Sequence, residues 1–296
     1  MIRVVFTLCL SGMLALATTA TAQSTDTDRI RVRQVDRITN RIVTHNVRTL
    51  AEQGANEDPC RDSGWDDNYY RFCEVREESL PAGPLSVDAG RNGGIRIEGW
   101  DRNEIRILAV VNANARSEAD AKQLASEVQI QAGGGRVSSA GPSTQGRQWW
   151  SVSFRINVPR KNDLDLNANN GGVSITGVSG TIRFETTNGG VNLTDLAGDV
   201  RGATRNGGLT VRLSGTRWDG TGLDVQTNNG GVTLAIPEGY NAELTTRTVN
   251  GGFRSDFPMT IQGELNPRQG ISTTLGAGGA PVSVRTTNGG LRINKR

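Results

Sequence analysis

The chain has 296 residues, a formal net charge of +3, 38 glycines, 5% aromatic residues and a single histidine. A chain of this length can bury a sizeable core, which argues against disorder throughout. Its glycine-rich, aromatic-poor composition is typical of a turn-rich β protein and not of a helical bundle. No basic stretch is interleaved with aromatic residues, so the sequence gives no support for nucleic-acid binding.

Residues 1–22 have the features of a secretory signal peptide. Arg3 supplies a positive charge, an apolar stretch runs from Val4 to Ala17, and Ala20-Thr21-Ala22 forms a cleavage site. The apolar stretch is shorter than the roughly 20 residues that a membrane-spanning helix needs. We therefore expect an exported protein, either periplasmic or at the cell surface or secreted, with no transmembrane segment in the mature chain.

Residues 23–80 are predicted to form a polar leader. Apolar residues at helical spacing predict a short amphipathic helix at about 36–53. Cys60 and Cys73 are the two cysteines that follow the signal peptide. In an oxidising compartment such a pair indicates a disulfide, whereas two thiols without a nearby histidine make poor zinc ligands.

Residues 81–160 are predicted to form a β region with one inserted helix. Stretches such as GIRIEGW and WSVSFRINV place apolar residues at every second position, which is the spacing of a strand. Between these stretches, Ser117 precedes a segment with apolar residues on one helical stripe. Serine is a favourable N-cap residue, so the helix is expected to begin there.

Residues 161–296 contain a repeated triplet, Asn-Gly-Gly. The triplets begin at Asn170, Asn188, Asn206, Asn229, Asn250 and Asn288, and a seventh copy begins at Asn92. Apolar residues recur three and five positions after most of these asparagines. A threonine stands two positions before five of them: Thr186, Thr204, Thr227, Thr248 and Thr286. Each unit is therefore expected to hold two short strands and two turns.

Two architectures are compatible with this repeat. The first is a mainly β fold of stacked coils, a right-handed parallel β-helix-like solenoid whose coils have about 18–23 residues. The second is a meander in which each Asn-Gly forms a hairpin turn. The shared register of threonine, asparagine and apolar positions favours coils, because stacking like residues on like residues produces ladders. The last interval, 38 residues, corresponds to about two coils.

We interpret the triplets as structural turns. Glycine adopts positive φ at little steric cost, and asparagine tolerates the left-handed region better than most residues. A sharp corner in every coil would then need one triplet, and the glycines would hold no ligand.

Catalytic and metal-binding interpretations have little support. No Gly-Lys-Ser or Gly-Lys-Thr sequence indicates a phosphate-binding loop, and no aspartate recurs at a fixed offset as in calcium-binding repeats. His45 lies in the leader, so a Ser-His-Asp triad has no base within the repeats. Arg183 and Arg201 share an offset, which is expected to give a solvated face. We expect no catalytic residue, no metal and no cofactor.

The segments TTNGGV, TVNGGF, RTTNGGLRI and VDAGRNGGIRIEGWDRNEI resemble a bacterial putative-adhesin family of unknown function that is built from NGG-bearing β-strand repeats. The resemblance extends over roughly residues 73–296. It implies a mostly β, solenoid-like fold in an exported envelope protein. It supplies no catalytic residues.

These observations predict a non-enzymatic, adhesin-like scaffold of the cell envelope that offers a polar ladder surface to polysaccharide or protein partners. The threonine row named above is the candidate contact surface. Two alternatives remain open: a solenoid polysaccharide lyase or hydrolase, and a periplasmic regulatory partner that makes contact through the disulfide-bearing leader.

Overall fold

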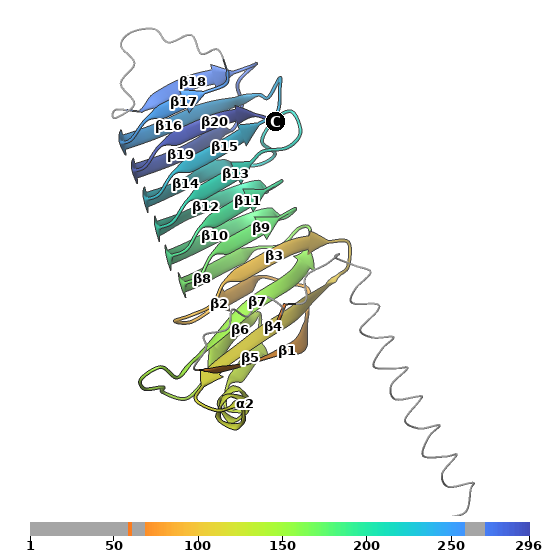
Figure 1. Cartoon of the computed structure of the whole chain (residues 1–296). Coiled ribbons are helices and arrows are strands. Elements are labelled where there is room, and N and C mark those ends of the chain that lie inside the picture. Colours follow the sequence, from red (N-terminus) through yellow and green to blue (C-terminus); the bar gives the residue numbers. More distant parts are fainter. Residues whose placement is uncertain (1–58, 61–68, 258–269) are drawn as a thin grey trace, which may run out of the picture. The chain divides into compact units, whose positions relative to one another are not determined.

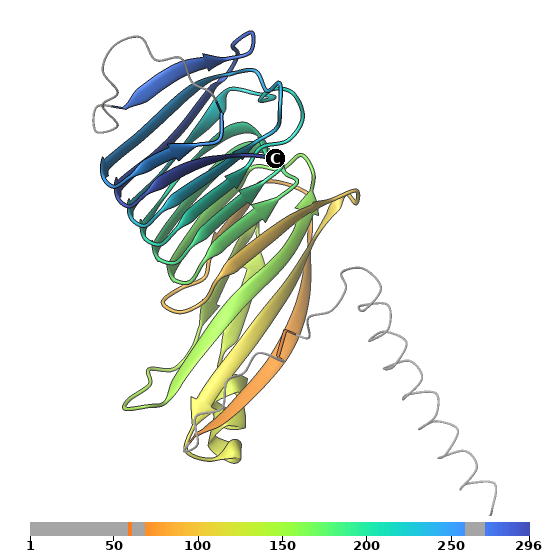
Figure 2. The same ribbon diagram turned by 45° about the horizontal axis from the view of Figure 1, so that its top comes forward.

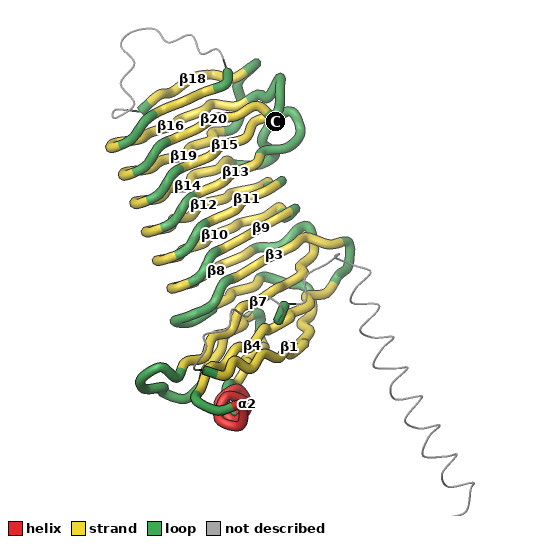
Figure 3. Tube along the Cα trace, viewed as in Figure 1, coloured by secondary structure: helices red, strands yellow, loops and turns green. Residues whose placement is uncertain are grey.

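The computed structural model describes residues 59–60, 69–257 and 270–296, all within one compact unit that begins at Pro59. The predicted signal peptide at 1–22, the predicted helix at 36–53 and His45 lie outside the described residues. The described residues form two ten-stranded sheets, called sheet A and sheet B below, and one helix, α2 (Glu118–Ser126) (Figure 3). The fold is therefore mainly β, as predicted.

Sheet A begins with antiparallel strands and continues as a parallel sheet. In spatial order its strands are β1 (Tyr70–Pro81), β4 (Glu104–Ala115), β7 (Trp149–Pro159), β3 (Ile95–Trp100), β9 (Val173–Thr176), β11 (Val191–Thr194), β13 (Leu209–Arg212), β15 (Val232–Ile236), β20 (Leu291–Lys295) and β17 (Phe253–Ser255).

Sheet B is parallel except at its two edges, where β18 and β5 pair antiparallel. In spatial order its strands are β18 (Ile271–Leu275), β16 (Ala242–Asn250), β19 (Pro281–Asn288), β14 (Gly222–Asn229), β12 (Ala197–Asn206), β10 (Ser179–Asn188), β8 (Leu164–Asn170), β2 (Leu85–Asp88), β6 (Arg136–Ala140) and β5 (Gln129–Gly133).

Each repeat is a coil that contributes one strand to each sheet. In one coil the chain runs along β10 in sheet B, turns at Gly189 and Gly190, and returns along β11 in sheet A. The next coil repeats this path with β12 and β13, and equivalent residues pair in parallel, Thr186 with Thr204 and Val191 with Leu209. Parallel pairing between coils confirms the stack and excludes a hairpin meander for these repeats (Figure 1).

The core lies between the two sheets, which the turned view separates into two layers (Figure 2). Apolar residues at alternate strand positions point inward, so that Ile182, Val200 and Leu223 of three adjacent coils stack on one another and are fully buried. The predicted apolar positions after the triplets are buried as well, from Val173 through Leu291, except in the coil of Asn250, where Phe253 and Ser255 are only partly buried. Burial of this continuous stack is the main force that stabilises the coils.

The predicted division at residue 160 does not separate the sheets. The seventh triplet, at Asn92, joins β2 to β3, which form the first coil of the stack. This coil pairs in parallel with the next one: Leu85 lies beside Leu164 in sheet B, and Ile95 lies beside Val173 in sheet A. The predicted middle and repeat regions therefore share both sheets and one core.

The C-terminal coil is inserted between two coils that precede it in the sequence. Strand β19 pairs on one side with β14 and on the other with β16, and β20 likewise lies between β15 and β17 (Figure 1). Asn288 is therefore stacked between Asn229 and Asn250. The interpretation of the 38-residue interval as two successive coils is wrong, because the chain passes through the antiparallel strand β18 and then turns back into the stack.

The predicted helix cap and the predicted disulfide are both present in the described residues. Ser117 accepts a hydrogen bond from the Asp120 amide at 3.1 Å, which confirms the predicted N-cap of α2. Cys60 and Cys73 form the predicted disulfide, with 5.6 Å between their Cα atoms, and so tie residue 60 to β1.

Within the described residues, no helix combines the length and apolar character needed to cross a membrane.

Candidate functional site: the corner and the outer faces of the stack

The seven asparagines of the triplets form one hydrogen-bonded ladder along the stack. The side-chain Nδ2 of six of them donates to the Oδ1 of the asparagine in the adjacent coil at 2.8–3.0 Å, and Asn92, at one end of the ladder, accepts from Asn170. In spatial order the ladder runs through Asn92, Asn170, Asn188, Asn206, Asn229, Asn288 and Asn250. Six of the amides are exposed, but the bonds between coils already engage them, so the ladder stabilises the corner itself.

The first glycine of each triplet is required by close contact between coils, not by positive φ. A Cβ atom built on Gly189 would lie 2.2 Å from the Gly171 carbonyl oxygen, and one on Gly207 would lie 2.0 Å from that of Gly189. Neither glycine has positive φ, and among the described residues that are not glycine only Asp195 does. Our prediction of positive-φ turns at the triplets is therefore wrong. The absent side chain instead lets one backbone approach the next.

The threonine row lies inside the coils and does not form a surface. Thr186, Thr204, Thr227, Thr248 and Thr286 are between 1% and 5% exposed. Each hydroxyl donates at 2.8 Å to the first glycine carbonyl of an adjacent coil, for example Thr204 to Gly189. A buried hydroxyl with this partner is not available to a ligand, so the predicted contact surface has to be corrected.

The second glycine of each triplet is in a different environment. Gly172, Gly190, Gly208, Gly231, Gly290 and Gly252 are all exposed. A Cβ atom on Gly190, Gly208, Gly231 or Gly290 would meet its nearest neighbour at 3.4–3.6 Å, an ordinary van der Waals contact, and one on Gly252 would meet nothing. All of these glycines except Gly208 line one of two shallow hollows, one near each end of the outer face of sheet A.

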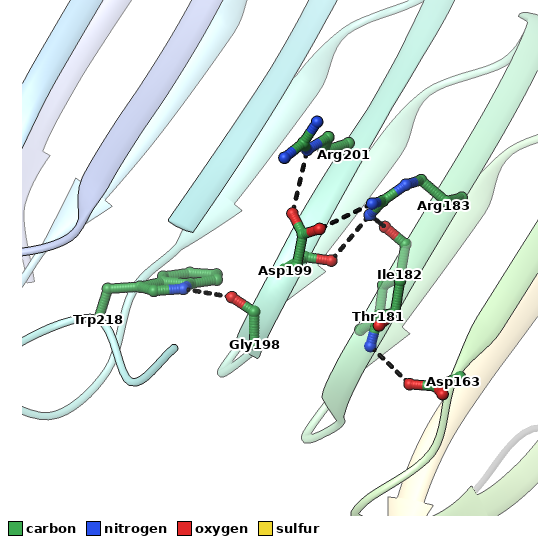
Figure 4. A network of polar contacts seen from close by, with 8 residues as sticks. All are labelled: Asp163, Thr181, Ile182, Arg183, Gly198, Asp199, Arg201 and Trp218. Atoms are coloured by element: carbon green, nitrogen blue, oxygen red, sulfur yellow. Dashed lines mark hydrogen bonds and ion pairs between the residues drawn. The ribbon is translucent and has the colours of Figure 1, made fainter. Parts of the chain in front are cut away.

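The outer face of sheet B is held by ion pairs between coils (Figure 4). The Asp199 carboxylate accepts from Arg183 Nη2 at 2.7 Å and from Arg201 Nε at 3.0 Å. The hydrogen bond from Arg183, helped by Arg201, lowers the pKa of Asp199 below its usual value against the opposing effect of burial. A carboxylate in this state is a weak general base. The arginines predicted to form a solvated face thus hold a structural carboxylate between them.

The same network fixes the edge of the coils. Thr181 donates its backbone N–H to Asp163 Oδ1 at 2.7 Å, and the Trp218 indole donates to the Gly198 carbonyl at 2.9 Å (Figure 4). Trp218 is buried and lies in the turn that joins β13 to β14. These contacts join residues of consecutive coils, so the network stabilises the stack.

The outer face of sheet A has a different character. A row of outward side chains crosses its parallel strands in register: Arg155, Arg96, Ser174, Asn192, Thr210, Thr233, Arg292 and Arg254. Small polar residues occupy the centre, and arginines occupy both ends. Among the described residues, Arg96, Arg254 and Arg292 form no ion pair. This row is therefore the candidate contact surface.

Sequence reasoning missed this row because its members differ in residue type. A shared offset of four positions after the triplet asparagine would have found it, since Arg96, Ser174 and Arg292 all stand there. The described part of the chain contains no group of three or more histidine, cysteine, aspartate or glutamate side chains that could hold a metal ion.

These features define a two-sheet stack of β coils with a structural corner and a polar outer face. The chain belongs to the Toastrack DUF4097 family, whose model matches residues 86–294. Among curated proteins, none matches the sequence.

Solved structures similar to this chain include three bacterial proteins. A putative cell adhesion protein from Clostridium sporogenes is 9% identical, with a TM-score of 0.43, and the match covers 75% of this chain and all of that one. A putative adhesin from Bacteroides fragilis is 11% identical, with a TM-score of 0.31 and coverage of 75% and 97%. A putative lipid binding protein from Parabacteroides distasonis is 12% identical, with a TM-score of 0.27 and coverage of 76% and 96%.

Proposed function

We propose that this protein is a non-enzymatic, adhesin-like scaffold of the bacterial cell envelope that binds a repetitive polymer or a surface protein along its stack. The observation that supports this most directly is the outer row of sheet A, in which polar side chains from successive coils lie in register. Neighbouring members of such a row are about 4.8 Å apart. A partner with its own regular repeat can therefore make equivalent contacts with several coils at once.

Export to the periplasm or the cell surface is part of this proposal. It rests on the signal-like sequence of residues 1–22 and on the disulfide between Cys60 and Cys73, since disulfides persist in oxidising compartments. The predicted right-handed winding of the coils is proposed with it.

Binding of the purified full chain to an array of envelope polysaccharides and peptidoglycan fragments tests the proposal. We expect retention of at least one polymer without any change in its chain length. Shortening of the polymer, abolished by replacing a single carboxylate, would instead support the lyase or hydrolase alternative. Retention of no polymer, together with capture of a periplasmic protein only when residues 23–80 are present, would support the regulatory alternative.

A further inference from the structure

Second glycines line two hollows on the outer face of sheet A, and these hollows together with the outward row that joins them are called the groove below. The first glycine of each triplet has no room for a side chain, whereas Gly208, Gly231 and Gly290 have ordinary van der Waals space and no positive φ. Contact with the next coil restricts the second glycine at Gly94 and Gly172, where a Cβ atom would lie 3.1 and 2.9 Å from a carbonyl oxygen, but it does not explain glycine in the three coils named above. One consequence is visible at both ends of the row, where second glycines and the adjacent outward side chains line a hollow.

Side chains that can hydrogen-bond to hydroxyl groups lie beside the glycines. Ser174, Asn192, Thr210 and Thr233 occupy consecutive coils, and each is at least partly exposed. Within the described part of the chain, these four side chains form no hydrogen bond. Hydroxyl and amide groups are donors and acceptors at once, so they suit the hydroxyl groups of a sugar chain.

The charged residues of the parallel strands of sheet A are mostly basic. The seven parallel strands from β3 to β17 contain one carboxylate, Glu98. Their basic residues are Arg96, Arg212, Arg254, Arg292 and Lys295, of which Lys295 is paired with Glu238. By contrast, the six strands of sheet B from β8 to β16 carry five acidic and five basic residues. An anion is therefore attracted to sheet A and not to sheet B.

The arginines are also placed against each other. Arg292 lies directly opposite Arg254, and Arg96 lies directly opposite Arg155. Like charges at directly opposite positions of a sheet destabilise it, and an anion bound between Arg292 and Arg254, which form no ion pair within the described residues, would remove that cost. Five strand spacings separate Arg96 from Arg292, so the two ends of the row are about 24 Å apart.

We propose that this groove binds a linear acidic polysaccharide that lies along the stack, with its carboxylates at the arginines and its hydroxyl groups on the small polar side chains. The inference rests on the proposed function and specifies its partner class. Nucleic acid fits less well, because the row between the arginines offers no aromatic side chain on which a base could stack.

The test measures binding of the full chain to polygalacturonate, to neutral galactan and to single-stranded DNA. The groove variant replaces Arg96, Arg254 and Arg292 by glutamine. The control replaces Arg136, Arg205 and Arg217, three exposed arginines outside the sheet A row, so both variants lose the same charge. We expect polygalacturonate binding that weakens with salt, a loss of about tenfold or more in the groove variant, and no such loss in the control.

A second pair of variants tests the groove without changing any charge. Gly290→Leu places a side chain in the hollow beside Arg254 and Arg292, and Thr287→Leu adds the same side chain to the exposed face of sheet B. We expect only Gly290→Leu to reduce polygalacturonate binding by about tenfold, with circular dichroism of both variants unchanged.

Three results would overturn the inference: equal loss in the groove and control variants, full binding by Gly290→Leu, or a preference for single-stranded DNA. Binding of neutral galactan that is insensitive to all these substitutions would also overturn it, while leaving the proposed scaffold function standing. Retention of none of the three polymers would overturn the inference as well, and would leave a surface protein as the partner of the proposed scaffold.

Discussion

At the scale of residues, the two glycines of one triplet have different physical roles. The first is set by backbone contact, since the coil beneath leaves about 2 Å for a Cβ atom. The second has van der Waals room in four coils and borders the groove. Thr204 and its equivalents complete the corner from inside, because their buried hydroxyls satisfy the carbonyl of that first glycine.

This difference predicts opposite effects of alanine at adjacent positions. Gly207→Ala should lower the free energy of unfolding by roughly 1–3 kcal/mol, because the new methyl group overlaps the Gly189 carbonyl. Gly208→Ala should leave it unchanged or raise it by about 0.5 kcal/mol. Urea unfolding of both variants measures the two values. An equal decrease in unfolding free energy in the two variants would show that the second glycine is also required for stability.

The ion pairs of Asp199 predict a defined acid sensitivity. Hydrogen bonding to Arg183 lowers the pKa of Asp199 in the folded state below its unfolded value of about 3.9. The stabilisation is therefore complete above about pH 4 and is lost as the pH falls through the lower, folded pKa. Asp199→Asn should show a smaller decrease in unfolding free energy between pH 7 and pH 3 than the unaltered chain. Asp165→Asn, an exposed carboxylate outside the network, is the control, and the same pH dependence in both variants would contradict the prediction.

At the scale of elements, the inserted C-terminal coil is the feature that the repeat pattern did not reveal. The same threonine and asparagine positions mark every coil, so Thr286 pairs equally with Thr227 on one side and Thr248 on the other. A local code shared by all coils cannot specify their stacking order. The order is decided by the edge of sheet B, where β18 pairs antiparallel with β16 and occupies the position that a further coil would take.

Deleting residues 281–296 should therefore open the stack in its interior and not shorten it at one end. Strands β14 and β16 would lose their shared neighbour and face each other across two strand spacings, about 10 Å. We expect amide hydrogen exchange to become faster throughout β16, while β8, β10 and β12 keep their protection as an internal control. Unchanged protection in β16 would mean that this coil restacks directly on β14, contrary to the prediction.

At the scale of the whole molecule, the described unit has one core that passes through every coil. Buried residues run without interruption from Leu85 to Ile293. The parallel stack ends in antiparallel strands on both sides, at β18 in sheet B and at β1 and β4 in sheet A. Such ends differ from the inner coils because a repeat with no further neighbour needs another way to cover its exposed edge.

A chain that begins at Pro59 should fold without the preceding residues. Both sheets, the core and the disulfide lie within residues 59–296. We expect its thermal unfolding midpoint and its circular dichroism spectrum to equal those of the chain that starts at Gln23. A clearly lower midpoint for the shorter chain would show that residues 23–58 contribute to the stability of the stack.

Features that depend on local spacing could be predicted from the amino-acid sequence. Alternating apolar residues predicted the strands and their inner faces, the shared offset of the triplets predicted stacked coils, and Ser117 predicted the start of α2. These predictions succeeded because strand alternation and helix capping act over a few residues.

Features that depend on which coils become neighbours could be seen only in the folded chain. Stacking buried the threonine row, gave the first glycine a steric reason unrelated to φ, placed Asn288 between Asn229 and Asn250, and aligned arginines distant in sequence across sheet A. The physical reason is that each of these features is a contact between coils. Such contacts depend on the order and spacing of the stack, which the repeated pattern leaves undetermined.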